Sequence, residues 1–558
     1  MTKTKYIPVL VSILAALILL ASPVCAEEIG GNCGSNLSWN LDTATGTLTI
    51  TGQGAMTYGD YAPWSDYSYD ITNVVIGEGV TTVSYNAFQG MLNLHTVSLP
   101  STVRSIGEYA FYGCSGLQNI SLVYVENIDQ YAFYDCRSLS SLTIPSGILT
   151  ISYGAFSGCS GLQSIQFHGG VTQIGSYAFS GCSSLTTVTI PDSVTFIGDS
   201  AFHGNLTLEN ISFPETIRAI GKESFRGCTN LTEILIPYAT ERIGESAFRD
   251  CTSLKKLVVQ NQCIKIGERA FENCSTLEDV QLPEGLTEIY GGVFNSCRGL
   301  KHITLPKMLT VLGESAFSDC SSLTDIDIPA SVTKIDDLVF NGCTKLTTIT
   351  LHEGLKKIGK GAFKNCSVLE EVEIPASVSL INDAVFRGCK ALFSIKVSPK
   401  NKHYKSELTC LEGSRSHVLF NKNKSILLAY PGAVVEQDYT VPDSVVTISD
   451  WAFCEARNLS KVIIPDSVQS IGEGAFCNCT NLLRVSIPDS VTQIDDCAFR
   501  GCSGLKEIHI PSSVVEFGWG VFDGCDEQLK VYCEMGSAID TYCKGNRINT
   551  VYLDKVEA

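Results

Sequence analysis

The chain has 558 residues, of which 44% are hydrophobic and 18% are charged, and its formal net charge is −18. This length excludes a single small domain. The acidic balance, without any basic run, excludes the cationic face that nucleic-acid phosphates require, so we expect no nucleic-acid partner.

Residues 1–26 have the pattern of a secretion signal. Two lysines precede an apolar run, and Val24-Cys25-Ala26 places small residues before an expected cleavage point. The apolar run is shorter than the roughly 20 residues needed to cross a bilayer, which favours cleavage over a membrane anchor. A lipoprotein signal at Cys25 is the alternative. We expect a secreted or cell-surface protein with no membrane span after signal removal.

Residues 27–70 come before any regular repeat. Apolar and polar residues alternate over 37–41 and again over 46–50, with a polar turn between them. Alternation with a period of two is typical of strands that bury one face. We therefore expect an N-terminal β cap module over 27–70.

Phenylalanine then recurs with a period of 23 residues, with one interval of 22, and the series resumes after one interruption. The positions are Phe88, Phe111, Phe133, Phe156, Phe179, Phe202, Phe225, Phe248, Phe271, Phe294, Phe317, Phe340, Phe363, Phe386, Phe453, Phe476, Phe499 and Phe522. Such a period is typical of a solenoid, in which each coil buries its apolar face against its neighbours. We expect these rings to fill a stacked aromatic column.

One repeat shows the plan of a coil. Ile326 and Ile328 alternate as in a strand whose inward side chains enter a core, and Pro329 ends that strand because it cannot donate the next hydrogen bond. Val332 and Ile335 predict a second short extended piece on the opposite wall. A corner around the phenylalanine then returns the chain to the next strand.

This pattern, L-x-x-I-x-I-P followed by S-V-T-x-I-G and A-F-x-G-C, closely resembles the BspA-type leucine-rich-repeat family over about residues 70 to 525. The resemblance implies a β-rich leucine-rich-repeat solenoid with a parallel sheet, 23-residue coils, short helical corners and terminal caps. We place the solenoid over 71–393 and 441–526, interrupted by an irregular hairpin-bearing repeat over 394–440. A C-terminal cap over 527–558 resembles the terminal strand and helix of the family.

The interruption contains two apolar segments, 418–420 and 426–430, around a polar turn, which is a hairpin pattern. Family members often carry such an irregular repeat, so we favour a structural role for it over a dedicated ligand site.

Fifteen of the 24 cysteines lie three residues after a repeat phenylalanine. They are Cys114, Cys136, Cys159, Cys182, Cys228, Cys251, Cys274, Cys297, Cys320, Cys343, Cys366, Cys389, Cys479, Cys502 and Cys525. We favour reduced, buried thiols that pack as small apolar groups, because stacked side chains stay wider apart than a disulfide prefers. Cys454 with Cys477, and Cys533 with Cys543, are the best candidates for real bridges.

No motif points to catalysis. The histidines are scattered over different coils, and the sequence has no H-E-x-x-H, G-x-S-x-G or phosphate-binding loop. Metal binding needs converging ligands, and we expect none. We therefore expect no enzyme, no catalytic residue, no metal and no cofactor.

The residues between the inward side chains of each strand must face outward. Most are polar, and eight of the seventeen are Ser or Thr, which fits a varied solvated face. Two departures are candidate protein contacts, one apolar and basic, the other acidic. The candidates are Leu235, Val258, Lys255 and Lys256 for the first, and Glu370, Glu371 and Glu373 for the second.

Proteins that the repeats resemble are linked to adhesion and to binding of extracellular matrix. The resemblance therefore implies a monomeric secreted or cell-surface protein that mediates protein–protein interaction, with extracellular or host proteins as partners and adhesion to host or neighbouring-cell proteins as its role. The alternative is a non-binding structural spacer or cell-envelope scaffold. A carbohydrate-binding role lacks the aromatic platform it would need on the outward positions.

Overall fold

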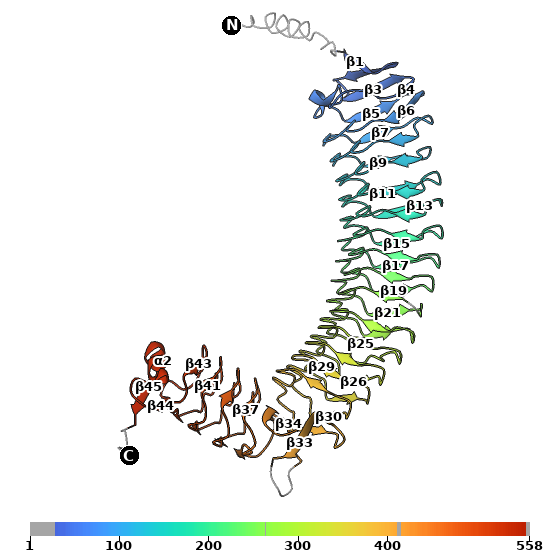
Figure 1. Ribbon diagram of the computed structural model, residues 1–558. Coiled ribbons are helices and arrows are strands. Elements are labelled where there is room, and N and C mark those ends of the chain that lie inside the picture. Colours follow the sequence, from blue (N-terminus) through green and yellow to red (C-terminus); the bar gives the residue numbers. More distant parts are fainter. Residues whose placement is uncertain (1–27, 263, 410–414, 554–558) are drawn as a thin grey trace, which may run out of the picture. The chain divides into compact units, whose positions relative to one another are not determined.

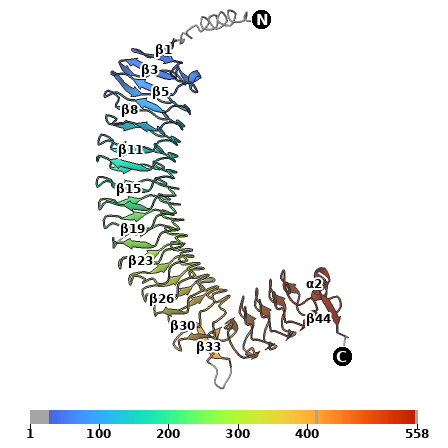
Figure 2. The ribbon, with the colours of Figure 1, turned by 180° about the vertical axis from the view of Figure 1, so that it is seen from behind.

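The computed structural model describes residues 28–262, 264–409 and 415–553. The chain divides into two compact units, Met1–Val194 and Thr195–Ala558, called unit 1 and unit 2 below. Figures 1 and 2 show short strands stacked coil upon coil within each unit. The division after Val194 lies inside the segment 71–393 that the sequence predicts as one run of coils.

Unit 1 begins with an antiparallel cap. Strand β1 (Glu28–Gly34) pairs with β2 (Leu37–Asp42), which pairs with β3 (Thr47–Gly52), and β3 then runs parallel to β5 (Asn73–Ile76). The cap also holds β4 (Gly54–Ala55) and a 3-10 turn, η1 (Ser65–Tyr67). Trp64 is fully buried, and its indole Nε1 donates a 2.7 Å hydrogen bond to the Ala87 carbonyl, so the cap is joined to the first coil.

Each coil of unit 1 contributes one strand to each of two walls. The first wall continues from β5 with β7 (Thr96–Ser98), β9 (Asn119–Ile120), β11 (Ser141–Ile144), β13 (Ser164–Phe167) and β15 (Thr187–Thr189). The second wall holds β6 (Val80–Val83), β8 (Ser105–Ile106), β10 (Asn127–Ile128), β12 (Thr150–Ile151) and β14 (Gln173–Ile174). Neighbouring strands are parallel, as in the pairing of Ser141–Ile144 with Ser164–Phe167.

Unit 2 repeats this plan. Its first wall holds β17 (Asn210–Ser212), β19 (Glu233–Ile236), β21 (Lys256–Val259), β23 (Asp279–Gln281), β26 (Asp325–Ile328), β28 (Thr348–Leu351), β30 (Glu371–Ile374), β32 (Ser394–Val397), β36 (Asp438–Thr440), β38 (Lys461–Ile463), β40 (Arg484–Ser486) and β42 (Glu507–His509). Its second wall holds β16 (Phe196–Ile197), β18 (Ala219–Ile220), β20 (Arg242–Ile243), β22 (Lys265–Ile266), β24 (Glu288–Ile289), β25 (Val311–Leu312), β27 (Lys334–Ile335), β29 (Lys357–Ile358), β31 (Leu380–Ile381), β37 (Thr447–Ile448), β39 (Ser470–Ile471), β41 (Gln493–Ile494) and β43 (Glu516–Phe517).

The strand predicted from Ile326 and Ile328 is β26. Both side chains are buried. Asp325, before Ile326, and Asp327, between the two isoleucines, are exposed, as the period of two requires. In the parallel pairing with β28, Ile326 lies beside Ile349 of the next coil. The predicted second extended piece is β27, which ends at Ile335.

The predicted aromatic column is present in both units. Ring centroids of neighbouring repeat phenylalanines lie 4.8–5.9 Å apart, and most ring planes are nearly parallel. Where the period is interrupted, Tyr430 stacks on Phe453 with centroids 4.8 Å apart. The column therefore restarts on a tyrosine that the period alone does not identify.

The corners are not the short helices predicted from the sequence. They are successive turns, and within the described ranges the only α-helix is α2 (Ala538–Asn546). The residue two positions before each phenylalanine has a positive φ, as in Tyr131 (54°), Glu223 (52°) and Leu338 (58°). A left-handed residue in every corner interrupts right-handed helical dihedrals, so no helix can propagate there.

The interruption and the C-terminus both add structure to unit 2. Strand β33 (Tyr404–Leu408) pairs antiparallel with β34 (His417–Asn421), which forms the predicted hairpin with β35 (Ile426–Ala429). At the end, β44 (Lys530–Cys533) continues the first wall, α2 follows, and β45 (Asn549–Tyr552) runs parallel to β44. In the described part of the chain, no helix has the length and apolar character of a membrane span.

Candidate functional site

The apolar pair predicted on the outer face is formed by adjacent strands. Leu235 of β19 and Val258 of β21 are direct partners in the parallel register. Leu235 is 48% exposed and Val258 is partly exposed, so both face outward as predicted. Together they form a small apolar area on the first wall of unit 2.

The basic character predicted beside this pair is offset by the register. Lys256 lies between Glu233 of the preceding strand and Asp279 of the following strand. Both acidic residues are on the same outward face because they share its register position. Lys255 is exposed and lies just before β21. The two predicted lysines therefore lie together, beside the opposite charges of Glu233 and Asp279. Both acidic residues are 23 positions from Lys256 in the sequence, so the repeat period predicts this arrangement.

The predicted acidic spot is likewise flanked by a cation. Glu373 is the register partner of Lys396, whose Nζ donates a 2.7 Å hydrogen bond to Oε1 of Glu371. Glu370 is exposed just before β30. The three glutamates lie together, and one of them is paired with the neighbouring coil.

A larger outward feature was missed by the sequence reasoning. An open groove of about 860 Å³ lies over β38, β40 and β42, and exposed Ile463 (46%) and Leu483 (51%) contribute apolar surface to it. Lys461, Arg484 and Glu507 rim this groove, and the Arg484 Nε lies 3.4 Å from Glu507 Oε2. We call it the β38–β42 groove. Leu483 lies just before β40 and so is not among the outward strand positions from which contacts were predicted. The groove was therefore not predicted.

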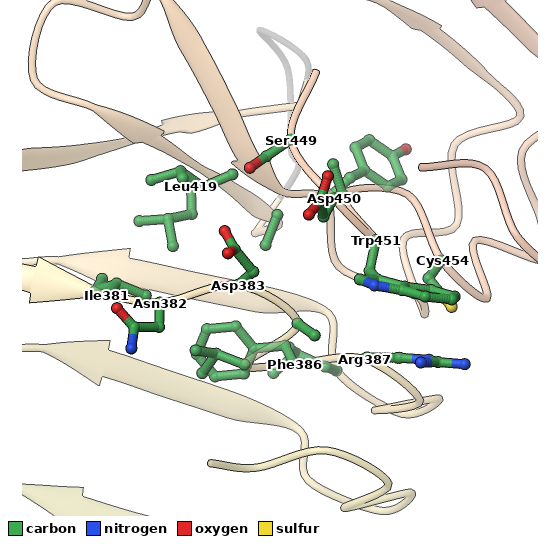
Figure 3. Close-up of a pocket in the computed structure, with 18 residues that line it drawn as sticks. Ile381, Asn382, Asp383, Phe386, Arg387, Leu419, Ser449, Asp450, Trp451 and Cys454 are labelled. Carbon is green, nitrogen blue, oxygen red and sulfur yellow. The ribbon is translucent and has the colours of Figure 1, made fainter. Parts of the chain in front are cut away.

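A small, partly open cavity lies beside the interruption (Figure 3). Its volume is about 30 Å³, enough for roughly one water molecule and too small for an organic ligand. Asp383 and Asp450 turn toward the same space, and burial, together with the nearby Asp383 charge, raises the pKa of Asp450. On the same coils, the Arg387 guanidinium lies over the Trp451 ring, with its Cζ 3.3 Å from the ring centroid.

The cysteine column has a role that the sequence did not reveal. Every one of the fifteen column thiols donates a hydrogen bond to the carbonyl of the phenylalanine one coil earlier, at S···O distances of 3.0–3.4 Å. Burial raises the pKa of Cys159 and of Cys228 to about 12, which holds these thiols protonated. The column links coils through S–H donors in addition to filling space.

The two pairs proposed as disulfides are free thiols here, as are all cysteines in the described ranges. Cys454 and Cys477 are hydrogen-bonded to each other. That contact lowers the pKa of Cys477, and the guanidiniums of Arg387 and Arg500 act in the same direction. Cys477 is therefore the thiol that ionises most readily in this pair.

No metal-binding cluster of three or more His, Cys, Asp or Glu side chains occurs among the residues that the structure describes. What the described surface offers is a set of open outward faces with mixed apolar and charged groups, a chemistry suited to recognition of large partners.

Comparison with known proteins agrees with this architecture. The family model described as "BspA type Leucine rich repeat region" matches residues 81–209, 197–324, 310–426 and 436–547. None of the curated proteins matches the chain.

Three solved structures illustrate the likeness. A leucine-rich repeat protein from Bacteroides ovatus is 22% identical over 93% of this chain and 99% of its own, with a TM-score of 0.33. A leucine rich cell surface protein from Faecalibacterium prausnitzii is 27% identical over 66% of this chain and 95% of its own, with a TM-score of 0.35. A leucine-rich repeat protein from Eubacterium ventriosum is 19% identical over 94% of this chain and 85% of its own, with a TM-score of 0.28.

The family match spans most of the chain and follows the coils that carry the phenylalanine and cysteine columns. The chain belongs to the BspA-type leucine-rich-repeat family.

Proposed function

We propose that this protein is secreted or displayed on a cell surface, where it binds extracellular proteins of a host or of neighbouring cells and so mediates adhesion. Export is supported by the signal pattern of residues 1–26. The binding role is supported by the open outward faces of the repeat, because a rigid array of coils presents a large surface without needing reactive groups.

The observation that carries the proposal is the β38–β42 groove. Exposed Ile463 and Leu483 both line the groove, and Lys461, Arg484 and Glu507 line it with them. Exposed apolar surface with a polar rim is typical of protein interaction sites. The Leu235–Val258 pair offers a second, smaller area of the same kind on the first wall.

The test is a binding screen of residues 27–558 against purified extracellular-matrix and serum proteins, read by surface plasmon resonance. Three variants are tested beside the parent chain. The first combines Ile463→Ser and Leu483→Ser, the second combines Lys255→Glu and Lys256→Glu, and the third lacks the hairpin of 417–429. Val515→Ser is the matched control, since Val515 is an exposed apolar residue outside the groove. We expect saturable binding that falls about tenfold or more in the groove variants and not in the control.

A non-binding spacer or cell-envelope scaffold is the competing function. Absence of saturable binding to every protein in the screen, by a chain shown to be folded, would replace the adhesion proposal with this one.

A further inference from the structure

Seven tyrosines of unit 1 form one continuous cluster at the corners of its coils. Tyr85, Tyr109, Tyr131, Tyr153 and Tyr177 follow strands β6, β8, β10, β12 and β14, one in each coil. Tyr112 and Tyr134 form a second row beside them. We call these seven residues the tyrosine ladder.

Every ring of the ladder contacts the next. Along the first row the centroids are 6.0, 5.3, 5.2 and 5.3 Å apart, and Tyr112 lies 4.8 Å from Tyr134. The rows meet edge to face, with Tyr109 and Tyr112 5.6 Å apart and Tyr131 and Tyr134 5.9 Å apart. The side chains are thus held in place before any partner arrives, which lowers the entropy lost on binding.

The ladder leaves much aromatic surface in contact with solvent. Tyr85 is 48% exposed, Tyr153 38% and Tyr177 41%, and the other four rings are partly exposed. The planes of Tyr85 and Tyr109 differ by 81°, and those of Tyr131 and Tyr153 by 68°. In each such T-shaped pair, the ring that presents its edge has neither face covered by that neighbour.

The surroundings of the ladder are acidic. Residues 28–194 contain no lysine, and their two arginines are already paired, Arg137 with Asp135 at 2.8 Å and Arg104 with Glu126 at 3.6 Å. Glu108 precedes Tyr109 directly, and after burial it is the main cause that raises the pKa of that hydroxyl. The ladder therefore presents aromatic rings beside carboxylates, and residues 28–194 contain no lysine and no unpaired arginine.

Unit 2 shows what such a ring attracts. Of its repeat corners, one carries an aromatic residue two positions before the phenylalanine, Trp451. The guanidinium of Arg387, from the coil before the interruption, lies over that ring, with its Cζ 3.3 Å from the ring centroid. A planar guanidinium stacks on aromatic faces and pairs with carboxylates, whereas a lysine ammonium is more strongly hydrated and does so less well.

We propose that the tyrosine ladder, with Glu108 beside it, binds an arginine-bearing basic segment of a partner protein. The partner supplies free guanidiniums, which residues 28–194 lack, and these stack on the exposed rings and pair with carboxylates such as Glu108. This extends the proposed function to a second surface, in a different unit from the β38–β42 groove, so either surface can fail alone.

The test uses residues 27–558 and a fluorescent synthetic peptide in which arginine alternates with serine, with lysine and glutamate versions as matched probes. We expect saturable binding of the arginine peptide, about tenfold weaker binding of the lysine peptide and none of the glutamate peptide. Tyr109→Ser with Tyr131→Ser should weaken arginine-peptide binding about tenfold or more. Tyr238→Ser, at an exposed tyrosine of unit 2, is the control and should bind as the parent does.

Two further variants separate recognition from folding. Tyr109→Phe with Tyr131→Phe keeps the stacked rings and should keep most of the affinity, while Glu108→Gln removes one carboxylate and should weaken binding several-fold without disturbing the ladder. Equal binding of the arginine and lysine peptides, equal binding by the serine variant, or no binding at all would overturn the proposal. So would a neutral oligosaccharide that binds the parent and not the serine variant, because it would make the ladder a carbohydrate site.

Discussion

The two units share a core and differ at its corners. In unit 1 the positions two before and one after the phenylalanine hold Tyr109, Tyr112, Tyr131 and Tyr134, in stacked rows. In unit 2 three coils hold an ion-pair network at these positions and at Asp250, which lies two residues after Phe248. Its contacts join Arg226 to Glu223 at 3.3 Å, Arg226 to Asp250 at 3.5 Å and Arg249 to Glu272 at 3.3 Å.

This difference separates what the repeat must conserve to fold from what it is free to vary. The buried phenylalanine and the thiol that donates to the preceding carbonyl recur in both units, whereas the corner side chains exchange aromatic stacking for charge. The corner is thus a position where one scaffold carries two chemically different surfaces.

The largest expected effect tests the shared core. Because burial raises the pKa of the column thiols, to about 12 for Cys159 and Cys228 against 9.0 in an unfolded chain, the unfolded state loses its protons first as pH rises. Stability is therefore complete below about pH 9 and falls between pH 9 and 12, by about 1.4 kcal/mol per pH unit for each thiol. Circular dichroism against pH should show both units unfolding in this window; a flat profile to pH 12 would contradict the account.

The next effect compares the aromatic columns directly. Phe133→Ala in unit 1 and Phe340→Ala in unit 2 each remove a fully buried ring from a stack, and we expect a loss of about 3–5 kcal/mol in each case. Hydrogen exchange of the flanking coils measures the loss in each unit separately. Tolerance of the substitution by one unit alone would show that the cores are not equivalent.

A smaller effect isolates the thiol hydrogen bond. Cys136→Ala and Cys343→Ala leave the carbonyls of Phe111 and Phe317 without their S–H donor, at a cost of about 1–3 kcal/mol each. Denaturant unfolding of the alanine variants measures this loss. The serine variants keep a donor at the same position and should lose less; equal losses for serine and alanine would assign the column to space filling alone.

The smallest effects distinguish the corners. Arg249→Gln removes contacts that are about one-third exposed, so we expect about 0.5 kcal/mol, shrinking further in salt. Tyr131→Ser in unit 1 removes ring contacts worth about 1 kcal/mol that salt leaves unchanged. Thermal unfolding at low and high ionic strength checks this; the same salt dependence for both would erase the contrast between the corners.

A thiol-labelling experiment bears on Cys454 and Cys477, which lie outside the cysteine column of unit 2. Cys477, with its pKa lowered by the Cys454 contact and by two arginines, should react with iodoacetamide at pH 8 before the column thiols of either unit. Mass spectrometry of peptides after brief labelling identifies the first site. Preferential labelling of a column cysteine would contradict the assigned roles.

Much of the fold could be predicted because it depends on inward residues. The period of the phenylalanines and the alternation at Ile326 and Ile328 directly reflect burial, and burial leaves a strong sequence pattern. The corners were mispredicted as helical because an αL residue such as Leu338 has no composition signal of its own.

The surface was harder to predict because it depends on neighbours in other coils. The charges beside Lys256 follow from residues 23 positions away on either side, and a prediction made strand by strand misses them. The tyrosine ladder was not predicted either, because it lies outside the outward strand positions. Tyrosines do recur at intervals of 22 to 24 residues from Tyr85 to Tyr177, and this period indicates a row of rings.

The most direct test of the central claim, that recognition resides on surface positions that the shared core leaves free, is radical footprinting with and without the arginine peptide, read by mass spectrometry. We predict that the oxidation of Tyr109, Tyr131 and Tyr153 slows when the peptide is bound, while exposed Tyr238 and the buried phenylalanines keep their rates. Unchanged rates along the ladder in the presence of bound peptide would contradict the account.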